Sequence, residues 1–423
     1  MNRRVAYSAL AFACAASRLG VLLHVRDTIT GSNAEKSDLF AQLFVAHGTY
    51  GLLPGEPSAY TQPLYGWFLI PVYWLFGRSW ASIGIAQIVL AIVTAWIVYE
   101  IGRRVIGPRA GLVGAAIATL NPYLIWHDVH VNREIVDQVC AAALVLLTLM
   151  IAKRPSRRLA VLLGVVTGLA LLGNSRLVFV PILCAVYLAF CLRRARSSAL
   201  VCGLVLVGAG VVVAPWLIRN KLDVGCWAIT TDGRAMWKAN NPRTYALLSS
   251  GQWIDNVGSN VPRPPHPGYL TPDEAHGIYE RTHHRVLLHP DECLEMTFYE
   301  NLALDWMRQH PGDKAKLAAL SAKLLWQPSV FETSGRPGAG TNLDIGRRVV
   351  EPAYMWILYA LALVGLFIAP RRFVALALAL LAYNTAVALV FVGATRYRVA
   401  WDFLLAILAA AALAHVAKRV RSR

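Results

Sequence analysis

Charged residues are scarce in this sequence. Asp, Glu, Lys and Arg together make up 15% of the 423 residues, whereas hydrophobic residues make up 57%. That leaves too little polar surface to cover a soluble protein of this size. The net charge of +17 would suggest nucleic acid if the basic residues clustered on a soluble domain, but they occur in short runs between apolar segments. The composition therefore indicates an integral membrane protein and argues against a nucleic-acid partner.

Other features are also missing. The sequence has no internal repeat, no low-complexity tract and no recognisable soluble domain at either end. None of the seven cysteines has the spacing of a structural zinc site. Five of them lie in apolar segments, where they are expected to pack as small hydrophobic residues. Cys226 and Cys293 share the one large polar region, and the sequence leaves open whether they form a disulfide or stay as two free thiols.

Long apolar runs dominate the chain instead. A helix needs about 20 mostly apolar residues to cross the ~30 Å hydrocarbon core of a bilayer. Ten segments are predicted to do so, at approximately residues 5–24, 79–101, 110–126, 134–152, 159–173, 177–192, 199–217, 352–369, 373–392 and 399–417. The first resembles a signal peptide at its start, but the spans that follow indicate an uncleaved segment. We therefore predict an all-α polytopic membrane protein with about ten transmembrane helices.

Basic residues between these segments predict the orientation of the chain. They fall on the same side as the N-terminus, in runs at 103–109, 153–158, 193–196, 371–372 and 418–423. By the positive-inside rule this side is the cytoplasm. Both termini are therefore expected in the cytoplasm, in a multi-pass plasma (inner) membrane protein. The first loop (25–78) and residues 218–350 are then outside.

The apolar stretch 62–77 does not fit this alternation as a further span. It is marginal in length and contains Pro63, Pro71 and Gly77. We expect a re-entrant or interfacial pair of short helices in this part of the first outer loop. The predicted organisation then has three parts, namely an N-terminal transmembrane module at 1–217, a mostly helical outer region at 218–350 and C-terminal transmembrane helices at 351–423.

Two acids at the outer edge are candidate catalytic residues. Asp38 lies in a short predicted helix, with Ser37 as N-cap and Gly48 at the end. The helix dipole alone would favour an acid there, so a purely structural role is the alternative. Glu134 opens the fourth span, where capping explains it as well as chemistry does.

Five cations are expected at the same outer edge, namely Arg176, Arg219, Lys323, Arg396 and Arg398. A lipid phosphate held there needs such donors, because a guanidinium group matches phosphate geometry with two parallel hydrogen bonds. The alternative is that these side chains reach ordinary lipid head groups. Arg396 and Arg398 are the most informative, since they sit in a very short outer loop, where positive charge is normally avoided.

In their order along the chain, these segments resemble the GT-C glycosyltransferases of glycosyltransferase family 39 and its bacterial relatives, the protein mannosyltransferase and aminoarabinose transferase group. The resemblance is carried by the Asp38 helix ending in Gly48-Thr49-Tyr50-Gly51, Pro63-Leu64-Tyr65-Gly66-Trp67, Leu120-Asn121-Pro122, Glu134, Ala214-Pro215-Trp216 with Arg219-Asn220, His310-Pro311-Gly312, and Arg396-Tyr397-Arg398. Together they extend over most of the chain.

The resemblance implies transfer of a sugar from a polyprenyl-phosphate donor to a glycan, lipid or protein acceptor at the outer face, usually with inversion. Asp38 would be the base that takes the proton of the acceptor hydroxyl. Glu134 would orient the acceptor or help to hold a divalent ion. The donor phosphate would be held by the cations named above, with Arg396 and Arg398 foremost.

One departure from the family pattern concerns the first-loop acid. Many relatives carry paired acids there, whereas Asp38 follows Ser37, and Glu35 is nearby but not adjacent.

A transporter or flippase of lipid-linked sugars is the alternative function. Such proteins place functional polar groups near the middle of the membrane, while the charges of interest here gather at the outer edge. The pattern favours a transferase.

Overall fold

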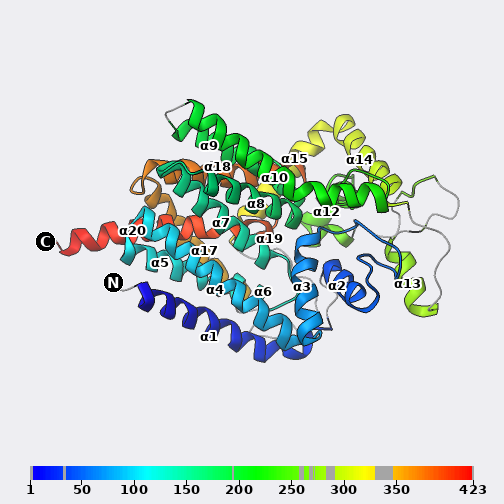
Figure 1. Cartoon of the computed structure of the whole chain (residues 1–423), viewed down its shortest axis with the longest axis horizontal. Helices are drawn as coiled ribbons and strands as arrows, with labels where there is room; N and C mark the ends of the chain where they lie inside the picture. Colours follow the sequence, from blue (N-terminus) through cyan, green and yellow to red (C-terminus); the bar gives the residue numbers. More distant parts are fainter. Residues whose placement is uncertain are drawn as a thin grey trace.

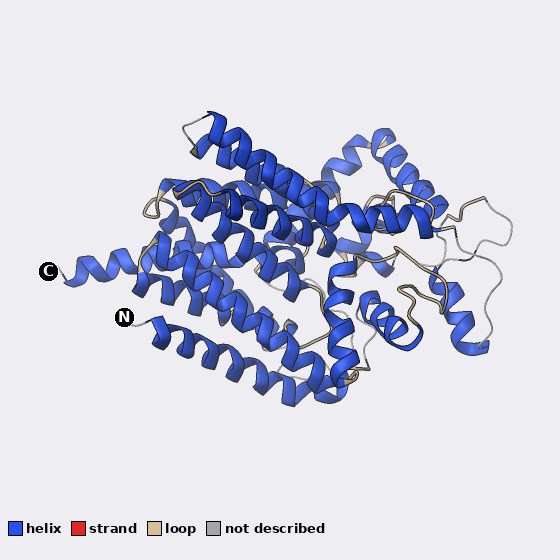
Figure 2. Ribbon diagram, in the orientation of Figure 1, coloured by secondary structure: helices blue, strands red, loops and turns tan. Residues whose placement is uncertain are grey.

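A computed structural model describes residues 3–31, 35–192, 195–256, 262–265, 270, 272–282, 291–328 and 346–421. These residues are almost wholly helix and connecting loop, as Figure 2 shows. The one β-type contact among them is a single bridge between Leu53 and Glu56. The predicted all-α fold class is confirmed.

The helices follow one another in a simple order. The first half of the chain forms α1 (Arg3–Ile29), α2 (Lys36–His47), α3 (Pro63–Phe76), α4 (Trp80–Val105), α5 (Pro108–Thr119), α6 (Pro122–His127), α7 (Glu134–Lys153), α8 (Arg157–Gly173), η1 (Ser175–Leu177), α9 (Val180–Cys191) and α10 (Ala195–Asp223). The second half forms α11 (Arg234–Ala239), α12 (Thr244–Ser249), α13 (Pro272–Thr282), α14 (Glu292–Gln309), α15 (Pro311–Trp326), α17 (Glu351–Leu366), α18 (Arg371–Val390), α19 (Thr395–Arg398) and α20 (Asp402–Arg421).

Seven helices within the described residues are long and apolar enough to cross a membrane. They are α1, α4, α7, α10, α17, α18 and the run from Thr395 to Val420 that includes α20. The chain is thus a multi-pass membrane protein. The remaining predicted spans are shorter helices, namely α5, α8 and α9, of 12, 17 and 12 residues. Twelve residues of helix extend only ~18 Å, less than the hydrocarbon core.

The predicted span 110–126 is wrong as a continuous helix. It breaks between α5 and α6, because Pro122 has no N–H to continue the backbone ladder and begins a new helix. Asn121 caps that helix, with its Oδ1 accepting from the Tyr123 N–H at 3.0 Å. The break turns the chain toward the residues that precede α7.

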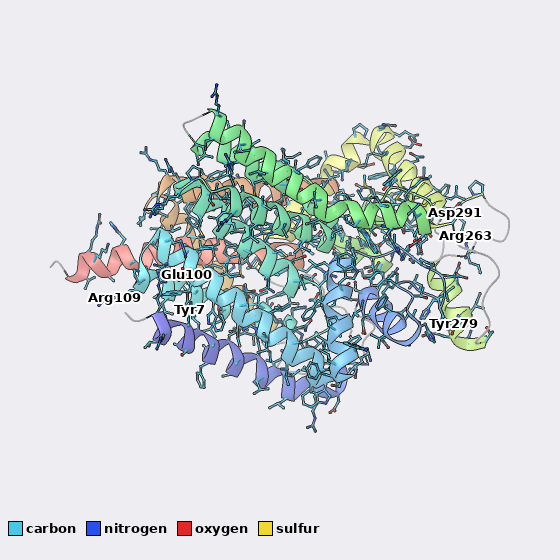
Figure 3. All side chains as sticks on the ribbon, viewed as in Figure 1. Tyr7, Glu100, Arg109, Arg263, Tyr279 and Asp291 are labelled. Atoms are coloured by element: carbon cyan, nitrogen blue, oxygen red, sulfur yellow. A yellow bond between two sulfur atoms is a disulfide. The ribbon has the colours of Figure 1, made fainter. Side chains whose placement is uncertain are left out.

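Both termini lie at the same end of the bundle in Figure 1, with α2, α3, α13 and α14 at the opposite end. In Figure 3, Arg109 lies toward the termini, whereas Arg263 and Asp291 lie at the far end. The termini and Arg109 thus lie at one end of the bundle, and Arg263 and Asp291 lie at the other.

Close helix packing fixes α7 in the middle of the bundle. Helix α7 packs against α4 and α8, and α8 in turn packs along α10. The α8–α10 contact depends on Gly164 and Gly208, since a Cβ on Gly164 would stand 2.6 Å from the carbonyl oxygen of Val205. The first residue of α7, Glu134, is therefore held by the core and not by a loose loop.

The first outer loop differs in two details from the prediction. Helix α2 ends at Gly48, whose φ of +71° suits glycine, but its N-cap residue is Glu35 and not Ser37. The Ser37 hydroxyl lies instead 3.1 Å from the Thr61 hydroxyl. The stretch 62–77 forms one helix, α3, and not a pair, and Pro71 is accommodated inside it. In Figure 1, α3 runs across the long axis that α1 and α4 follow, as an interfacial helix would.

Candidate active site

Arg396 joins two acids from distant parts of the chain. Its Nε lies 2.5 Å from Glu134 Oε1, and its Nη2 lies 2.9 Å from Glu35 Oε1. Glu35 occupies the N-cap position of α2, Glu134 begins α7 and Arg396 lies in the short α19, so three elements meet at one guanidinium group. Burial raises the pKa of the Glu35 carboxyl, while the neighbouring Arg133 and Arg396 guanidinium groups act against that shift.

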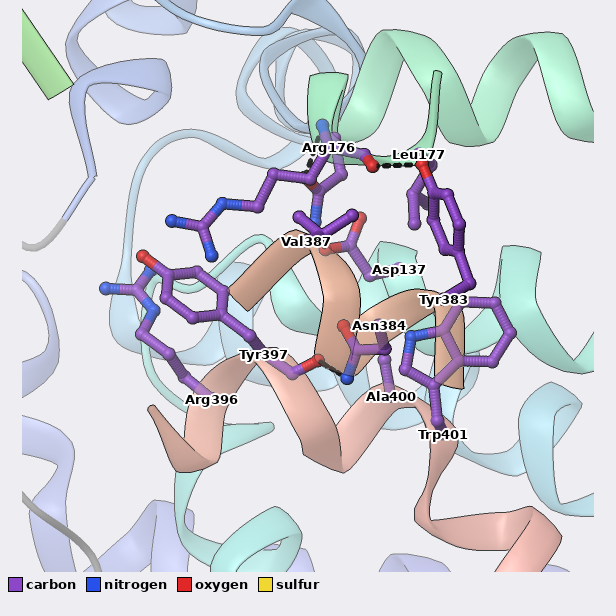
Figure 4. Close-up of a pocket in the computed structure, with 11 residues that line it drawn as sticks. Asp137, Arg176, Leu177, Tyr383, Asn384, Val387, Arg396, Tyr397, Ala400 and Trp401 are labelled. Atoms are coloured by element: carbon purple, nitrogen blue, oxygen red, sulfur yellow. Dashed lines mark hydrogen bonds between the residues drawn. The ribbon is translucent and has the colours of Figure 1, made fainter. Parts of the chain in front are cut away.

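A small cavity opens beside Arg396. Eleven residues line it, among them Asp137, Asn174, Arg176, Arg396 and Tyr397. Figure 4 shows the Arg176 and Arg396 side chains reaching the same side of the cavity, next to the Tyr397 ring. The Arg176 guanidinium stacks on that ring, with its carbon 3.6 Å from the ring centre, and the Arg396 carbon lies 5.6 Å from it. Two cations thus lie close to one aromatic ring.

Local structure holds each of these side chains in place. The Asn174 side chain caps the short helix η1 by accepting from the Arg176 N–H at 3.2 Å, and its amide donates to Asp137 Oδ2 at 3.0 Å. Arg176 Nη1 donates to the Val392 carbonyl oxygen at 3.1 Å. Asp137 and Glu134 are three residues apart on α7, so they share a helix face.

Some buried polar atoms near Arg396 have no hydrogen-bond partner in the described chain. Arg133 Nη1 donates to Gln62 Oε1 at 2.6 Å. However, Arg133 Nε and Glu134 Oε2 are buried and have no hydrogen-bond partner among the described residues. Buried polar atoms are rarely left in this state. We call Glu35, Arg133, Glu134, Asp137, Arg176 and Arg396 the charge cluster, which holds three cations and three acids.

Asp38 follows Glu35 by three residues, but its carboxylate bonds to residues outside the charge cluster. Its Oδ1 accepts from the Tyr73 hydroxyl at 2.6 Å and from Arg78 Nε at 3.0 Å, and its Oδ2 accepts from Arg78 Nη2 at 2.7 Å. Gln42 adds a fourth donor at 3.2 Å. Asp38 is 5% exposed. In this arrangement the carboxylate ties α2 to α3 and to Arg78, which lies between α3 and α4.

The predicted phosphate-binding cations lie in four different places. Arg176 and Arg396 line one cavity. Arg398 is fully buried and bonds to Asp402 at 3.1 Å and to the carbonyl oxygens of Leu325 and Gln327. Arg219 donates to the carbonyl oxygens of Ser58 and Tyr50 in the first outer loop. Lys323 is exposed on α15.

The carboxylate oxygens of Asp38 and Glu134, the two possible ligands of a divalent ion, are not arranged as a metal site. Both oxygens of Asp38 accept from Arg78, and Glu134 Oε1 accepts from Arg396. In the described part of the chain, no group of three or more His, Cys, Asp or Glu side chains is placed to hold a metal ion.

Three members of the charge cluster were not among the sequence candidates, namely Glu35, Arg133 and Asp137. Each has a local signal. Glu35 precedes Asp38 by three residues, close to one helical turn, while Arg133 adjoins Glu134 and Asp137 follows it by three. Two of the three, Glu35 and Asp137, thus lie three positions from a candidate acid, and the third lies directly beside one.

The bundle is that of a multi-pass membrane protein with a GT-C-like fold. Residues 57–218 match the family described as dolichyl-phosphate-mannose-protein mannosyltransferase, which supports the family resemblance over this part of the chain. The matched segment includes Glu134 and Arg176, whereas Glu35, Asp38 and Arg396 lie outside it. No curated protein sequence matches the chain.

One solved structure, that of AglB, supports the fold. The archaeal oligosaccharyltransferase AglB from Archaeoglobus fulgidus, in complex with an inhibitory peptide and a dolichol-phosphate, aligns with a TM-score of 0.54 at 12% identity. The alignment covers 98% of this chain and 50% of AglB, so the chain spans half the length of that enzyme. ArnT from Cupriavidus metallidurans bound to undecaprenyl phosphate aligns at 0.39 and 14% identity, over 90% of this chain and 73% of ArnT.

Proposed function

We propose that this chain is a membrane glycosyltransferase. It moves a sugar from a polyprenyl-phosphate donor to an acceptor hydroxyl on a glycan, lipid or protein, with inversion, at the outer face of the membrane. The observation that carries the proposal is Arg396, held between Glu35 and Glu134 beside a cavity that Arg176 also lines. The match of residues 57–218 to a dolichyl-phosphate-mannose-dependent family and the AglB-like fold support the reaction class.

The cations of the charge cluster suit a lipid phosphate. A phosphate at the cavity would meet two guanidinium groups, Arg176 and Arg396, that point to one side of it. Guanidinium groups bind phosphate with paired, charge-assisted hydrogen bonds. The buried Nε of Arg133 offers a further donor near the same carboxylates. Such donors stabilise the negative charge that develops on the leaving phosphate.

Donor binding would also change the surroundings of Glu35. Because Arg396 is already engaged by two carboxylates, an incoming phosphate competes with Glu35 for its Nη2 group. A released Glu35, with a pKa raised by burial, is suited to take the acceptor's proton. The acceptor oxygen then attacks the anomeric carbon, and the carbon–oxygen bond to the phosphate breaks with its electron pair on the phosphate.

The acid that acts as base is therefore assigned to Glu35 in this proposal, with Asp38 as the competing assignment. Asp38 has four donors and holds α2 against Tyr73 and Arg78. Glu35 accepts from Arg396 Nη2 at 2.9 Å, and Arg396 in turn lines the cavity. Glu134 keeps Arg396 in place, and its second oxygen is available to orient the acceptor.

The orientation follows from the charge pattern. The charge cluster is formed where α2, α7 and α19 begin, and the basic loops with both termini lie at the other end of the bundle. With the basic loops in the cytoplasm, the charge cluster faces outside. A cysteine-labelling scan should then label position 255 from outside and position 156 only after permeabilisation.

The function is tested with the purified protein in nanodiscs, titrated with polyprenyl-phosphate sugar and assayed for transfer. Arg396→Ala is expected to weaken donor binding by ~1.5–3 kcal/mol, the range for hydrogen bonds to a charged group, and Arg176→Ala should act in the same direction. The matched control is Arg109→Ala, which removes an exposed arginine at the other end of the bundle.

Unchanged donor affinity in both Arg396→Ala and Arg176→Ala would place the phosphate elsewhere. If the protein instead moved the intact lipid-linked sugar across the bilayer without cleaving it, the transporter alternative would replace the transferase. Lysine at position 396 should restore part of the affinity, because it keeps the charge and loses the paired geometry.

A further inference from the structure

Glu292 is a buried carboxylate that the proposed reaction does not use. It is the first residue of α14 and is 7% exposed. Its oxygens accept from the Ser58 hydroxyl at 2.5 Å, from the Thr231 hydroxyl at 2.7 Å and from the Ala59 N–H at 3.1 Å. All three donors come from outside α14, and two belong to the first outer loop. A buried acid satisfied in this way joins three distant segments.

The neighbours of Glu292 in the chain fix where this carboxylate lies. Cys293 forms a disulfide with Cys226, which follows α10. Asp291 caps α14 by accepting from the Leu294 N–H at 2.9 Å. The start of α14 is thus joined covalently to the segment after α10, which restricts the positions that the Glu292 side chain can sample. Burial raises the pKa of Glu292, and its three donors act against that shift.

The segment that Glu292 holds leads directly to α2. Thr61 lies two residues after Ala59, and its hydroxyl is 3.1 Å from the Ser37 hydroxyl. Between them, the Tyr60 ring lies 3.9 Å from the Lys36 ammonium group. Lys36 and Ser37 are the two residues that follow Glu35. The first turn of α2 therefore rests on the segment that Glu292 fixes.

We propose that Glu292 is a positioning residue for the charge cluster. By holding Ser58 and Ala59, it fixes the first turn of α2 through Tyr60 and Thr61, and so keeps Glu35 beside Arg396. The effect on activity rests on the proposed function, whereas the effect on the position of α2 does not. The disulfide keeps α14 in register for this contact.

The test compares Glu292→Ala and Glu292→Gln with the wild-type protein in nanodiscs. The matched control is Glu274→Gln. It removes the charge of a more exposed glutamate on α13, which pairs with Arg263. Hydrogen exchange is measured for residues 35–61 and for α17 and α18, together with donor affinity, kcat and KM. Glu292→Ala should speed exchange at 35–61 by about 10-fold or more and leave α17 and α18 unchanged.

The kinetic signature separates positioning from general destabilisation. A small displacement of a reacting group can cost up to about 100-fold in rate, so kcat is expected to fall by about 10- to 100-fold, with donor affinity within about twofold. Glu292→Gln keeps one acceptor oxygen and should show a smaller loss. Reduction of the disulfide in the wild-type protein should speed exchange in the same segment.

Unchanged exchange at 35–61 in Glu292→Ala would overturn the proposal, as would an equal rise of exchange in α17 and α18. If Glu292→Ala does not fold, Ser58→Ala removes one donor and leaves the carboxylate in place, and the same two criteria apply. Faster exchange at 35–61 combined with full transfer activity in Glu35→Gln would keep the positioning contact and reject the proposed function.

Discussion

Arg18 and Arg396 are both arginines held by acids, but their surroundings differ. Arg18 is 2% exposed, and its Nε and Nη2 lie 2.9 and 2.7 Å from one oxygen of Asp128. Its Nη1 donates to the Thr119 carbonyl oxygen at 3.1 Å, and Gln138 donates to the other Asp128 oxygen at 2.8 Å. The cavity beside Arg18 is lined mainly by apolar side chains. This pair is complete by itself.

The Arg396 site has spare capacity instead. The Arg396 side chain is 26% exposed and lines a cavity with a second arginine. Buried atoms of Arg133 and Glu134 next to it have no hydrogen-bond partner in the described chain. Burial of charge alone therefore does not identify a binding site. What separates the two places is unfilled hydrogen-bonding capacity beside a polar cavity.

The largest expected effect concerns Glu35. Glu35→Gln removes the proposed base while keeping the shape of the side chain, so transfer should fall by ~10²- to 10⁴-fold, the range for general acid–base catalysis. Donor affinity should stay the same or increase, because the phosphate no longer competes with a charged carboxylate for Arg396. Single-turnover transfer and donor titration in nanodiscs measure the two effects. Near-normal transfer in a folded Glu35→Gln protein would remove Glu35 from the mechanism.

The next largest effect concerns the buried pair of Arg18 and Asp128. Arg18→Met leaves the buried Asp128 carboxylate without its cation, and breaking such a pair costs ~3–5 kcal/mol of folding stability. The double variant Arg18→Met with Asp128→Leu should recover most of that loss, because no charge stays buried. Thermal unfolding in detergent gives the stabilities. If the double variant also lost transfer while remaining folded, the Arg18 pair would have a role beyond structure.

Much of the fold could be predicted from the sequence, because apolar length and basic loops depend on the bilayer alone. The break at Asn121-Pro122 was missed since the run 110–126 stays apolar on both sides of it. Arg396 and Arg398 were paired in sequence, yet side chains two apart on a helix do not face each other. That geometry sends Arg398 to Asp402 and leaves Arg396 at the cavity.

The acids of the first outer loop could be located from the sequence but not ranked. Asp38 has the position expected of a first-loop acid. No local sequence pattern shows that Tyr73 and Arg78 lie close enough to donate hydrogen bonds to its carboxylate. Both partners come from the α3 region, whose placement depends on tertiary packing. Glu35 reaches its partner across 361 positions of sequence, which no local pattern reveals.

A smaller effect is expected at Asp38. Asp38→Asn keeps the side-chain shape but weakens the hydrogen bonds to Arg78 and Tyr73, so stability should fall by ~1.5–3 kcal/mol, toward the lower value because Arg78 is partly exposed. Transfer should fall by less than about 10-fold. Denaturant unfolding and the transfer assay are run on the same preparation. A loss of transfer greater than that of Glu35→Gln would return the role of base to Asp38.

The smallest effect is a shift of the pH profile. Glu35 acts as a base only when ionised, and burial raises the pKa of its carboxyl, so transfer should rise with pH through a pKa above the ordinary glutamate value and then level off. Because the Arg396 guanidinium lowers the pKa of Glu35, Arg396→Ala should move this rise to higher pH in single-turnover assays at saturating donor. Glu35→Gln should abolish the rise, whereas Asp38→Asn should keep it. A rise that persists in Glu35→Gln and disappears in Asp38→Asn would reverse the assignment of the two acids and would leave Glu35 as a partner of Arg396 that resembles Asp128 beside Arg18.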